Sequence, residues 1–242
     1  MLIRIYYHQF NLKNELLINS ILSAIVLELS QGATMRNEVI HVISKDDSPM
    51  CSRISESQCA IMLHCPSDKT GLQYAYQFAH EFCHWLIGGT LSGECVGLFW
   101  LEETICELAS FHCLSVLRGK WSQFAPEYPL YLVDDYIFHM LKDGLPPAQL
   151  PLSGYINSHR GELYTPEYHR DLYSQMALAL YPHFRGRPEL WQLLPYFGDL
   201  KTHDRIDRWL EDMGHRTPAE LQPLVQAWSE LLLGSPQLHS QK

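Results

Sequence analysis

The chain lacks several features that mark nucleic-acid-binding and disulfide-bonded proteins. It has no run of lysine and arginine, and its net charge is −9, so a surface built to bind a phosphate backbone is not expected. It has no C-x-x-C pair, and its seven cysteines are odd in number, which favours a reducing compartment over a disulfide framework. We therefore expect a cytoplasmic protein without a nucleic-acid partner.

Long hydrophobic runs and leader signals are also missing. The most apolar stretch, LLINSILSAIVLEL, covers residues 16–29 and is too short to span a bilayer. Its apolar residues recur at helical spacing, which predicts a globular helix over residues 14–31. The first residues show no apolar segment followed by a small-residue cleavage site, so we expect no signal peptide. No membrane partner is expected either.

The composition is that of a globular protein with a sizeable core. Hydrophobic residues make up 46% of the 242 residues and charged residues 19%, which is ordinary for such proteins. The segments LIRIYYHQF, EVIHVIS and CAIMLHC have strand character, whereas the later part of the chain has helical patterns throughout. We therefore predict an α+β fold with a first domain over residues 1–150. A helical C-terminal part over residues 151–242 follows, and we leave open that it shares the same core.

Three further helix signals frame the candidate site. In the segment QYAYQFAHEFCHWLIGG, apolar residues recur every three or four positions, and Gly88-Gly89 is a stop signal. A second helix is predicted over about residues 98–117. Further along, the segment TPE at residues 165–167 has the pattern of a helix start, with threonine as N-cap and proline at the first helical position.

The first of these helices carries the motif H-E-x-x-H at His80, Glu81 and His84. The motif alone is weak, because the chain has 13 histidines and chance matches are easy. On a helix, however, residues four apart lie on the same face, so both imidazoles are able to bind one zinc ion. Glu81 lies about 100° around the helix and is free to act as a general base on a zinc-bound water.

A catalytic zinc site needs a third protein ligand and one open position. The predicted second helix contains the segment FWLEETICELASF, in which Glu103 follows His84 by 19 residues. Glu107 lies one turn further on the same face, and Glu102 points about 100° away. These acidic residues are the candidates for the missing ligand.

This combination resembles the gluzincin branch of the zincin metallopeptidases, whose H-E-x-x-H helix is followed by a ligand glutamate on a second helix. The resemblance implies a zincin-like domain with a small mixed sheet and two zinc-bearing helices. It implies that His80, His84 and Glu103 hold zinc and that Glu81 is the catalytic base. Glu102 stands where many gluzincins have asparagine, which leaves open which of the two adjacent glutamates coordinates. Glu107 matches a position where some members have a carboxylate that fixes a ligand histidine.

Two parts of the substrate cleft are also suggested by the sequence. The segment AIMLHC at residues 60–65 resembles the zincin edge strand that pairs with an extended peptide, so we expect an edge strand with one rim facing the cleft. A peptidase also needs a donor for the developing oxyanion. The sequence leaves seven candidates for that donor, namely Tyr155, His159, Arg160, Tyr164, Tyr168, His169 and Tyr173.

The sequence thus favours a zinc metallopeptidase that acts on peptide or protein substrates, with Zn²⁺ as its cofactor. Two other classes stay open. The chain could bind zinc without catalysis and serve as a regulatory or interaction module, or it could be a helical adaptor without metal. Neither the substrate, the cleavage preference nor the oligomeric state follows from the sequence.

Overall fold

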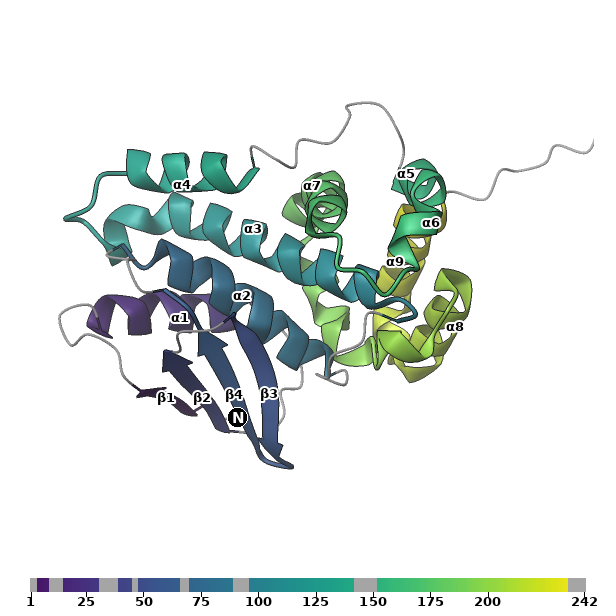
Figure 1. Cartoon of the computed structure of the whole chain (residues 1–242), viewed down its shortest axis with the longest axis horizontal. Helices are drawn as coiled ribbons and strands as arrows, with labels where there is room; N and C mark the ends of the chain where they lie inside the picture. Colours follow the sequence, from purple (N-terminus) through teal and green to yellow (C-terminus); the bar gives the residue numbers. More distant parts are fainter. Residues whose placement is uncertain are drawn as a thin grey trace, which may run out of the picture.

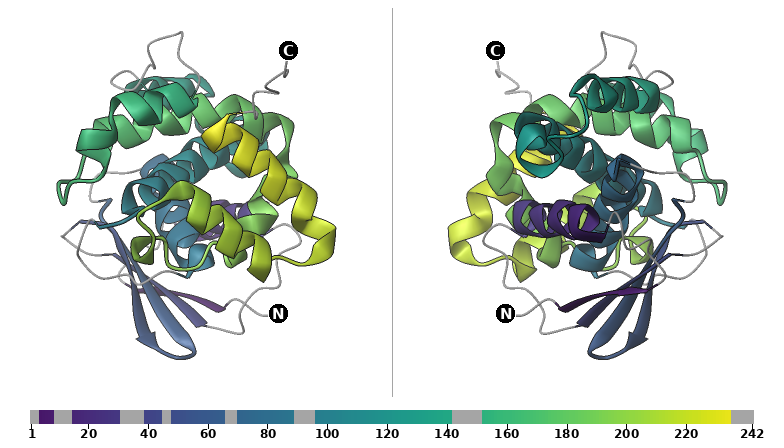
Figure 2. Two further views of the ribbon diagram at one scale, coloured as in Figure 1. Left: turned by 90° about the vertical axis from the view of Figure 1, so that its right-hand side faces the viewer. Right: turned by 90° about the vertical axis from the view of Figure 1, so that its left-hand side faces the viewer.

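The structure is a computed structural model that describes residues 4–8, 15–30, 39–44, 48–65, 70–88, 96–141 and 152–234. It confirms a mixed α+β architecture with a small mixed sheet. All the described helices lie on the same side of this sheet, which projects from the helical body in every view (Figures 1 and 2). None of the helices in the described ranges is long and apolar enough to cross a membrane.

The sheet contains β1 (Arg4–His8), β2 (Val39–Ser44), β3 (Met50–Ser55) and β4 (Gln58–Leu63). The strands are ordered β1-β2-β4-β3 across the sheet. The β1–β2 and β2–β4 pairs are parallel, whereas β3 runs antiparallel to β4. The sheet therefore has β1 and β3 at its two edges. The β3 edge lies beside the helix α2 (Leu72–Ile87) (Figure 1).

The prediction that AIMLHC forms an edge strand is wrong. Met62 of β4 lies opposite Ile43 on one side and opposite Met50 on the other, so β4 is paired along both of its sides. Its consecutive residues Ala60 and Ile61 are both buried, as expected for a strand with neighbours on both sides. The sequence analysis missed β3, because its residues MCSRIS lack a clear apolar alternation.

Two long helices carry the H-E-x-x-H motif and the acidic segment. They are α2 (Leu72–Ile87) and α3 (Phe99–Phe124). Helix α2 packs against β3, β4, α1 (Glu15–Leu29) and α3, so it is buried on nearly all sides. It ends at Gly88, whose φ of 72° is left-handed and therefore suits glycine. The predicted stop signal is confirmed.

After α3, the described residues form helices and 3₁₀ turns joined by short irregular segments. The α-helices are α4 (Tyr131–Leu141), α5 (Leu152–Ser158), α6 (Arg160–Leu163), α7 (Arg170–Gly186), α8 (Ile206–Arg216) and α9 (Gln222–Leu233), with short 3₁₀ turns at η1 (Pro188–Tyr196), η2 (Leu200–Thr202) and η3 (Ala219–Leu221). Helix α7 packs on α3, and one cluster of buried apolar side chains extends from Ile18 to Leu232. The boundary expected near residue 150 lies outside the described residues.

Helix α7 starts later than the sequence predicts. The hydroxyl of Thr165 donates to the carbonyl of Glu162, 2.8 Å away, instead of capping the residues that follow. The helix begins only at Arg170, so residues 165–169 form an irregular segment ahead of it. This correction matters for the site, because Tyr168 and Arg170 both line the central cavity.

The 3₁₀ turn η2 is fastened to the start of α3. The backbone N–H of Leu98 donates to the carbonyl of Leu200 at 3.1 Å. The preceding residue, Gly97, has a φ of 59°, and a Cβ atom there would lie 2.4 Å from the carbonyl oxygen of His203 and 2.5 Å from that of Lys201. Only glycine permits this approach of the two backbones.

We expect Gly97→Ala to lower the free energy of unfolding by about 1–3 kcal/mol, because it combines a left-handed backbone with a steric clash. Gly119→Ala is the matched control. Gly119 lies inside α3 and no atom approaches its Cβ position within 4 Å, so this change should stabilise the protein by up to about 1 kcal/mol. Chemical denaturation of both variants tests the difference, and equal stability would contradict the close approach at Gly97.

Candidate metal centre

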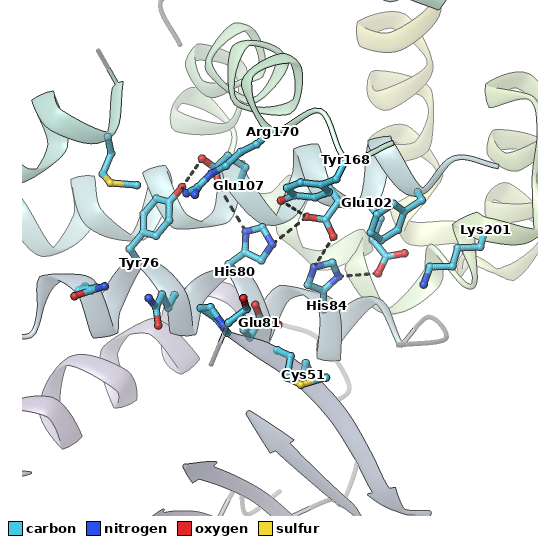
Figure 3. Close-up of a pocket in the computed structure, with 18 of the residues that line it drawn as sticks. Cys51, Tyr76, His80, Glu81, His84, Glu102, Glu107, Tyr168, Arg170 and Lys201 are labelled. Carbon is cyan, nitrogen blue, oxygen red and sulfur yellow. Dashed lines mark hydrogen bonds and ion pairs between the residues drawn. The ribbon is translucent and has the colours of Figure 1, made fainter. Parts of the chain in front are cut away.

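The structure brings His80, His84 and Glu103 together at the interface of α2 and α3. One ligand atom from each residue lies within 4.8 Å of the other two. The Nε2 atom of His80 is 3.3 Å from Oε2 of Glu103, and the Nε2 atom of His84 is 3.2 Å from Oε1 of the same carboxylate. The two imidazoles point from α2 toward α3 (Figure 3). These are the three side chains that the sequence singled out.

Small residues allow the two helices to approach closely. Ala79 and Cys83 on α2, and Cys106 and Ala109 on α3, are all fully buried. The Sγ atom of Cys83 lies 3.9 Å from the carbonyl oxygen of Ile105, which places it against the backbone of α3. Because the separation of packed helices depends on the side chains at their contact, these residues set the distance across which the ligands meet.

The outer nitrogen of each histidine faces a second carboxylate. The Nδ1 atom of His84 lies 2.7 Å from Oε1 of Glu102, and the Nδ1 atom of His80 lies 3.6 Å from Oε2 of Glu107. Such partners fix the ring orientation and direct Nε2 toward a metal. The structure therefore places Glu103 in the cluster and Glu102 behind His84, a role that the sequence did not predict.

Glu107 belongs to a hydrogen-bond network that reaches α7. It accepts hydrogen bonds from the hydroxyls of Tyr76 and Ser174, the latter at 2.9 Å. Nη2 of Arg170 donates in turn to the hydroxyl oxygen of Tyr76 at 3.3 Å. The sequence analysis missed Tyr76, Ser174 and Arg170, since nothing in the local sequence shows that α7 crosses α3 at this point.

Of the seven candidate oxyanion donors, only Tyr168 lines the cavity. Its hydroxyl donates to Oε2 of Glu103 at 3.0 Å. Tyr155, by contrast, donates to Gln175 away from the cavity, and Tyr173 donates to the carbonyl of Glu167. Tyr168 reaches the cavity because α7 begins only at Arg170. Tyr168 therefore lies in the irregular segment ahead of the helix, where its hydroxyl contacts Glu103.

Glu81 lies on the side of α2 that faces β3. Its carboxylate accepts a hydrogen bond from the backbone N–H of Cys51, and its residue is only 7% exposed. Burial raises the pKa of Glu81 above its ordinary value, although His80 and His84 oppose this effect. Glu81 is thus close to the cluster without belonging to it (Figure 3), as the motif predicts.

The cluster lies in the wall of a cavity of about 600 Å³. The start of β3 forms one side of this cavity, and α2 and α3 form its floor. Tyr136 and Met140 of α4, Tyr168 and Arg170 near the start of α7, and Lys201 of η2 complete it. Residues from beyond position 151 therefore close a site whose centre lies in the first half of the chain.

Opposite charges dominate the cluster in the absence of metal. Burial lowers the pKa of His80, but Glu103 and Glu107 outweigh burial and raise this pKa to about 10. Burial likewise opposes protonation of His84, yet the charge of Glu103 and the hydrogen bond to Glu102 hold its pKa well above the ordinary value. The pKa of Glu103 is lowered by the two histidines despite its burial. These shifts favour the protonated form of both histidines.

The donor set suits zinc. Ligand atoms about 2 Å from one tetrahedral ion lie roughly 3.3 Å apart. Each histidine Nε2 lies at such a distance from one of the two Glu103 oxygens, and the set with one ligand atom per residue fits within 4.8 Å. Two imidazoles and one carboxylate form a ligand set that catalytic zinc sites use. The outer nitrogen of His84 is already held by Glu102, and that of His80 faces Glu107 at 3.6 Å.

Comparison of the chain with protein-family models and with curated proteins found no match. The function is therefore inferred from the geometry of the cluster and of the cavity around it. Within the described ranges, one group of His, Cys, Asp or Glu side chains brings three potential metal-ligand atoms together, namely His80, His84 and Glu103.

The raised pKa of His80 makes the stability of the metal-free protein depend on pH. A group whose pKa is raised on folding stabilises the fold below its ordinary pKa of about 6.5, and this contribution is lost as the pH rises through about 10. We therefore expect the Tm of chelator-treated protein to fall between about pH 7 and pH 10. Zinc occupies the same nitrogens, so zinc-loaded protein should show a much smaller decline by differential scanning calorimetry. Identical profiles with and without zinc would contradict the assignment.

Proposed function

We propose that this protein is a zinc metallopeptidase of the gluzincin type. The observation that carries the proposal is the arrangement of four residues. His80, His84 and Glu103 each bring a potential ligand atom within 4.8 Å of the other two, while Glu81 stays outside the cluster and beside it. The cluster also lines an open cavity. An ion-pair network that only stabilised the fold would not need such a cavity beside it.

In this proposal the cluster binds the metal, and the three glutamates around it have separate roles. A zinc ion held by the cluster supplies Lewis acidity, which polarises a carbonyl group and lowers the pKa of water to about 7. Glu102 and Glu107 hold the outer nitrogens of His84 and His80 and so keep both rings in place. Glu81 takes a proton from the attacking water and delivers it to the leaving amine.

The position of β3 favours a peptide over a small substrate. Residues 48–51, which lead into and begin this edge strand, line the cavity next to Glu81. An edge strand binds an extended chain through backbone hydrogen bonds, which accept many side-chain sequences. The docking strand is therefore β3, in place of the interior strand β4 that the sequence suggested.

Tyr168 is the residue best placed to stabilise negative charge on the scissile carbonyl. Its phenol oxygen lies 3.0 Å from Glu103, so it reaches the position where the donor atoms converge. Burial and the charge of Glu103 raise the pKa of Tyr168, and the phenol stays protonated as a hydrogen-bond donor. A preorganised donor of this kind contributes to the rate mainly in the transition state.

We expect Glu81→Gln to abolish hydrolysis of an unstructured protein while zinc content stays near one ion per chain. The amide keeps the size of the side chain but cannot accept the proton. His80→Ala should instead remove both zinc and activity, because it deletes a ligand. Zinc is measured by elemental analysis of purified protein and turnover by peptide mapping. Glu127→Gln, on an exposed residue, is the matched control and should leave both unchanged.

The same measurements separate the alternative functions. Wild-type protein that holds one zinc ion but cleaves no member of a broad peptide library would support the regulatory or interaction module. Wild-type protein that is purified without chelator and takes up no added zinc would support the metal-free adaptor. Loss of zinc in Glu81→Gln would show that Glu81 is a ligand and would reject its role as base.

We expect Tyr168→Phe to lower kcat by about 10²-fold or more, the effect of removing one oxyanion donor. The KM and the zinc content should change little, because the ring and the three ligands remain. Tyr155→Phe is the control, since Tyr155 lies away from the cavity. An unchanged kcat in Tyr168→Phe would assign the oxyanion donor to another residue.

A further inference from the structure

Arg170 is a cation in the wall of the cavity that the proposed mechanism does not use. It is the first residue of α7 and lies on the His80 side of the cluster, whereas Lys201 lies toward the opposite end (Figure 3). Both residues line the cavity. The guanidinium group stays charged at any physiological pH and offers five N–H donors in a fixed plane.

The side chain of Arg170 is held in position by its neighbours. Its Nη2 atom donates to the hydroxyl oxygen of Tyr76 at 3.3 Å, and that hydroxyl donates in turn to Glu107. Tyr76 is only 5% exposed, so its ring is fixed by packing. Because the guanidinium is oriented before any ligand arrives, little conformational entropy is lost when a ligand binds.

Arg170 also differs from other arginines of the chain in its partners. Arg118, Arg205 and Arg208 each form an ion pair with a carboxylate close by. Within the part of the chain that the structure describes, no carboxylate lies within ion-pair distance of Arg170, and its hydrogen-bond acceptor is Tyr76. Despite partial burial, Tyr76 and the charge of Glu107 raise the pKa of Arg170, so Glu107 balances part of its charge without bonding to the guanidinium. The geometry therefore leaves guanidinium donors for a group that enters the cavity.

The cavity wall on this side includes aromatic and apolar side chains beside polar ones. Tyr136 of α4 makes an edge contact with Tyr76, with ring centroids 6.5 Å apart. Met140 lies one turn after Tyr136 on the same helix and also lines the cavity. A short methylene chain that ends in a carboxylate matches such a subsite, because its apolar part packs on the walls and its charge reaches the guanidinium.

We propose that Arg170 binds a carboxylate of the substrate and makes the cleft selective for acidic peptides. The inference depends on the proposed peptidase function for its substrate, and it assigns the carboxylate to the His80 side of the scissile bond. The carboxylate belongs either to an Asp or Glu side chain or to the end of the peptide. Glu81, Glu102, Glu103 and Glu107 all line the cavity, so an acidic peptide needs a local cation to enter.

Binding to the zinc-loaded Glu81→Gln protein tests this inference without turnover. The probes are alanine-based octapeptides with both ends blocked, which carry a single Glu or a single Gln at successive positions. By calorimetry we expect the Glu peptide to bind about tenfold more tightly than its Gln partner at one position or two adjacent positions, since hydrogen bonds to charged groups contribute more than neutral ones. The same scaffold with a free carboxyl end distinguishes a terminal carboxylate from a side-chain carboxylate.

Variants of Arg170 in the same background assign the effect to this residue. Arg170→Gln should remove the preference for Glu, and Arg170→Lys should retain part of it, because lysine keeps the charge but not the paired donors. Arg208→Gln is the matched control, because Arg208 lies on α8 in an exposed pair with Glu211, and it should keep the full preference. Zinc content and Tm of each variant are measured alongside.

The proposal is overturned if neither a Glu side chain nor a free carboxyl end strengthens binding, if no probe binds, or if the preference for a carboxylate survives in both Arg170 variants. Turnover by the wild-type protein is scored separately. Hydrolysis without any preference for a carboxylate rejects the role of Arg170 and leaves the peptidase function standing. Tighter binding of carboxylate-bearing peptides without hydrolysis by wild-type protein rejects the peptidase function and leaves the carboxylate subsite standing.

Discussion

The close packing of α2 against α3 is the contact on which the rest of the site depends. It places two imidazoles from one helix and three carboxylates from the other in a buried network. Burial makes isolated charges costly, so the network holds together only because every histidine nitrogen faces a carboxylate. The same pairing that satisfies these charges also points both Nε2 atoms at Glu103.

The segments after residue 151 supply the remaining walls of the site. Helix α7 crosses α3 and brings Ser174 onto Glu107, while the segment ahead of it lays Tyr168 over Glu103. The turn η2 is tied to the start of α3 at Leu98 and brings Lys201 to the cavity. The resulting cavity is lined by residues from both halves of the chain.

The helical parts of the site could be predicted because their signals are local. Apolar residues at three- and four-residue steps define α2, and the spacing of His80 and His84 places both on one face. Glu103 is expected from the resemblance to the gluzincins, and the sequence leaves Glu102 open beside it. The edge strand could not be predicted, since strand order depends on which strands pair across the sheet. The TPE pattern predicted a start of α7 that is too early. The hydroxyl of Thr165 donates to the preceding carbonyl of Glu162, and the pattern does not show this alternative.

The sequence by itself determined the two helices, the histidine pair with its adjacent glutamate, and the acidic segment one helix later, because helical geometry converts spacing into direction. Only the tertiary structure decided which glutamate joins the cluster, which one lies behind His84, and that β3 borders the cleft. It also decided that Tyr76, Tyr168 and Arg170 reach the site, because these residues meet through contacts between segments up to 94 residues apart. Such contacts depend on how whole helices pack, and no local pattern records that packing.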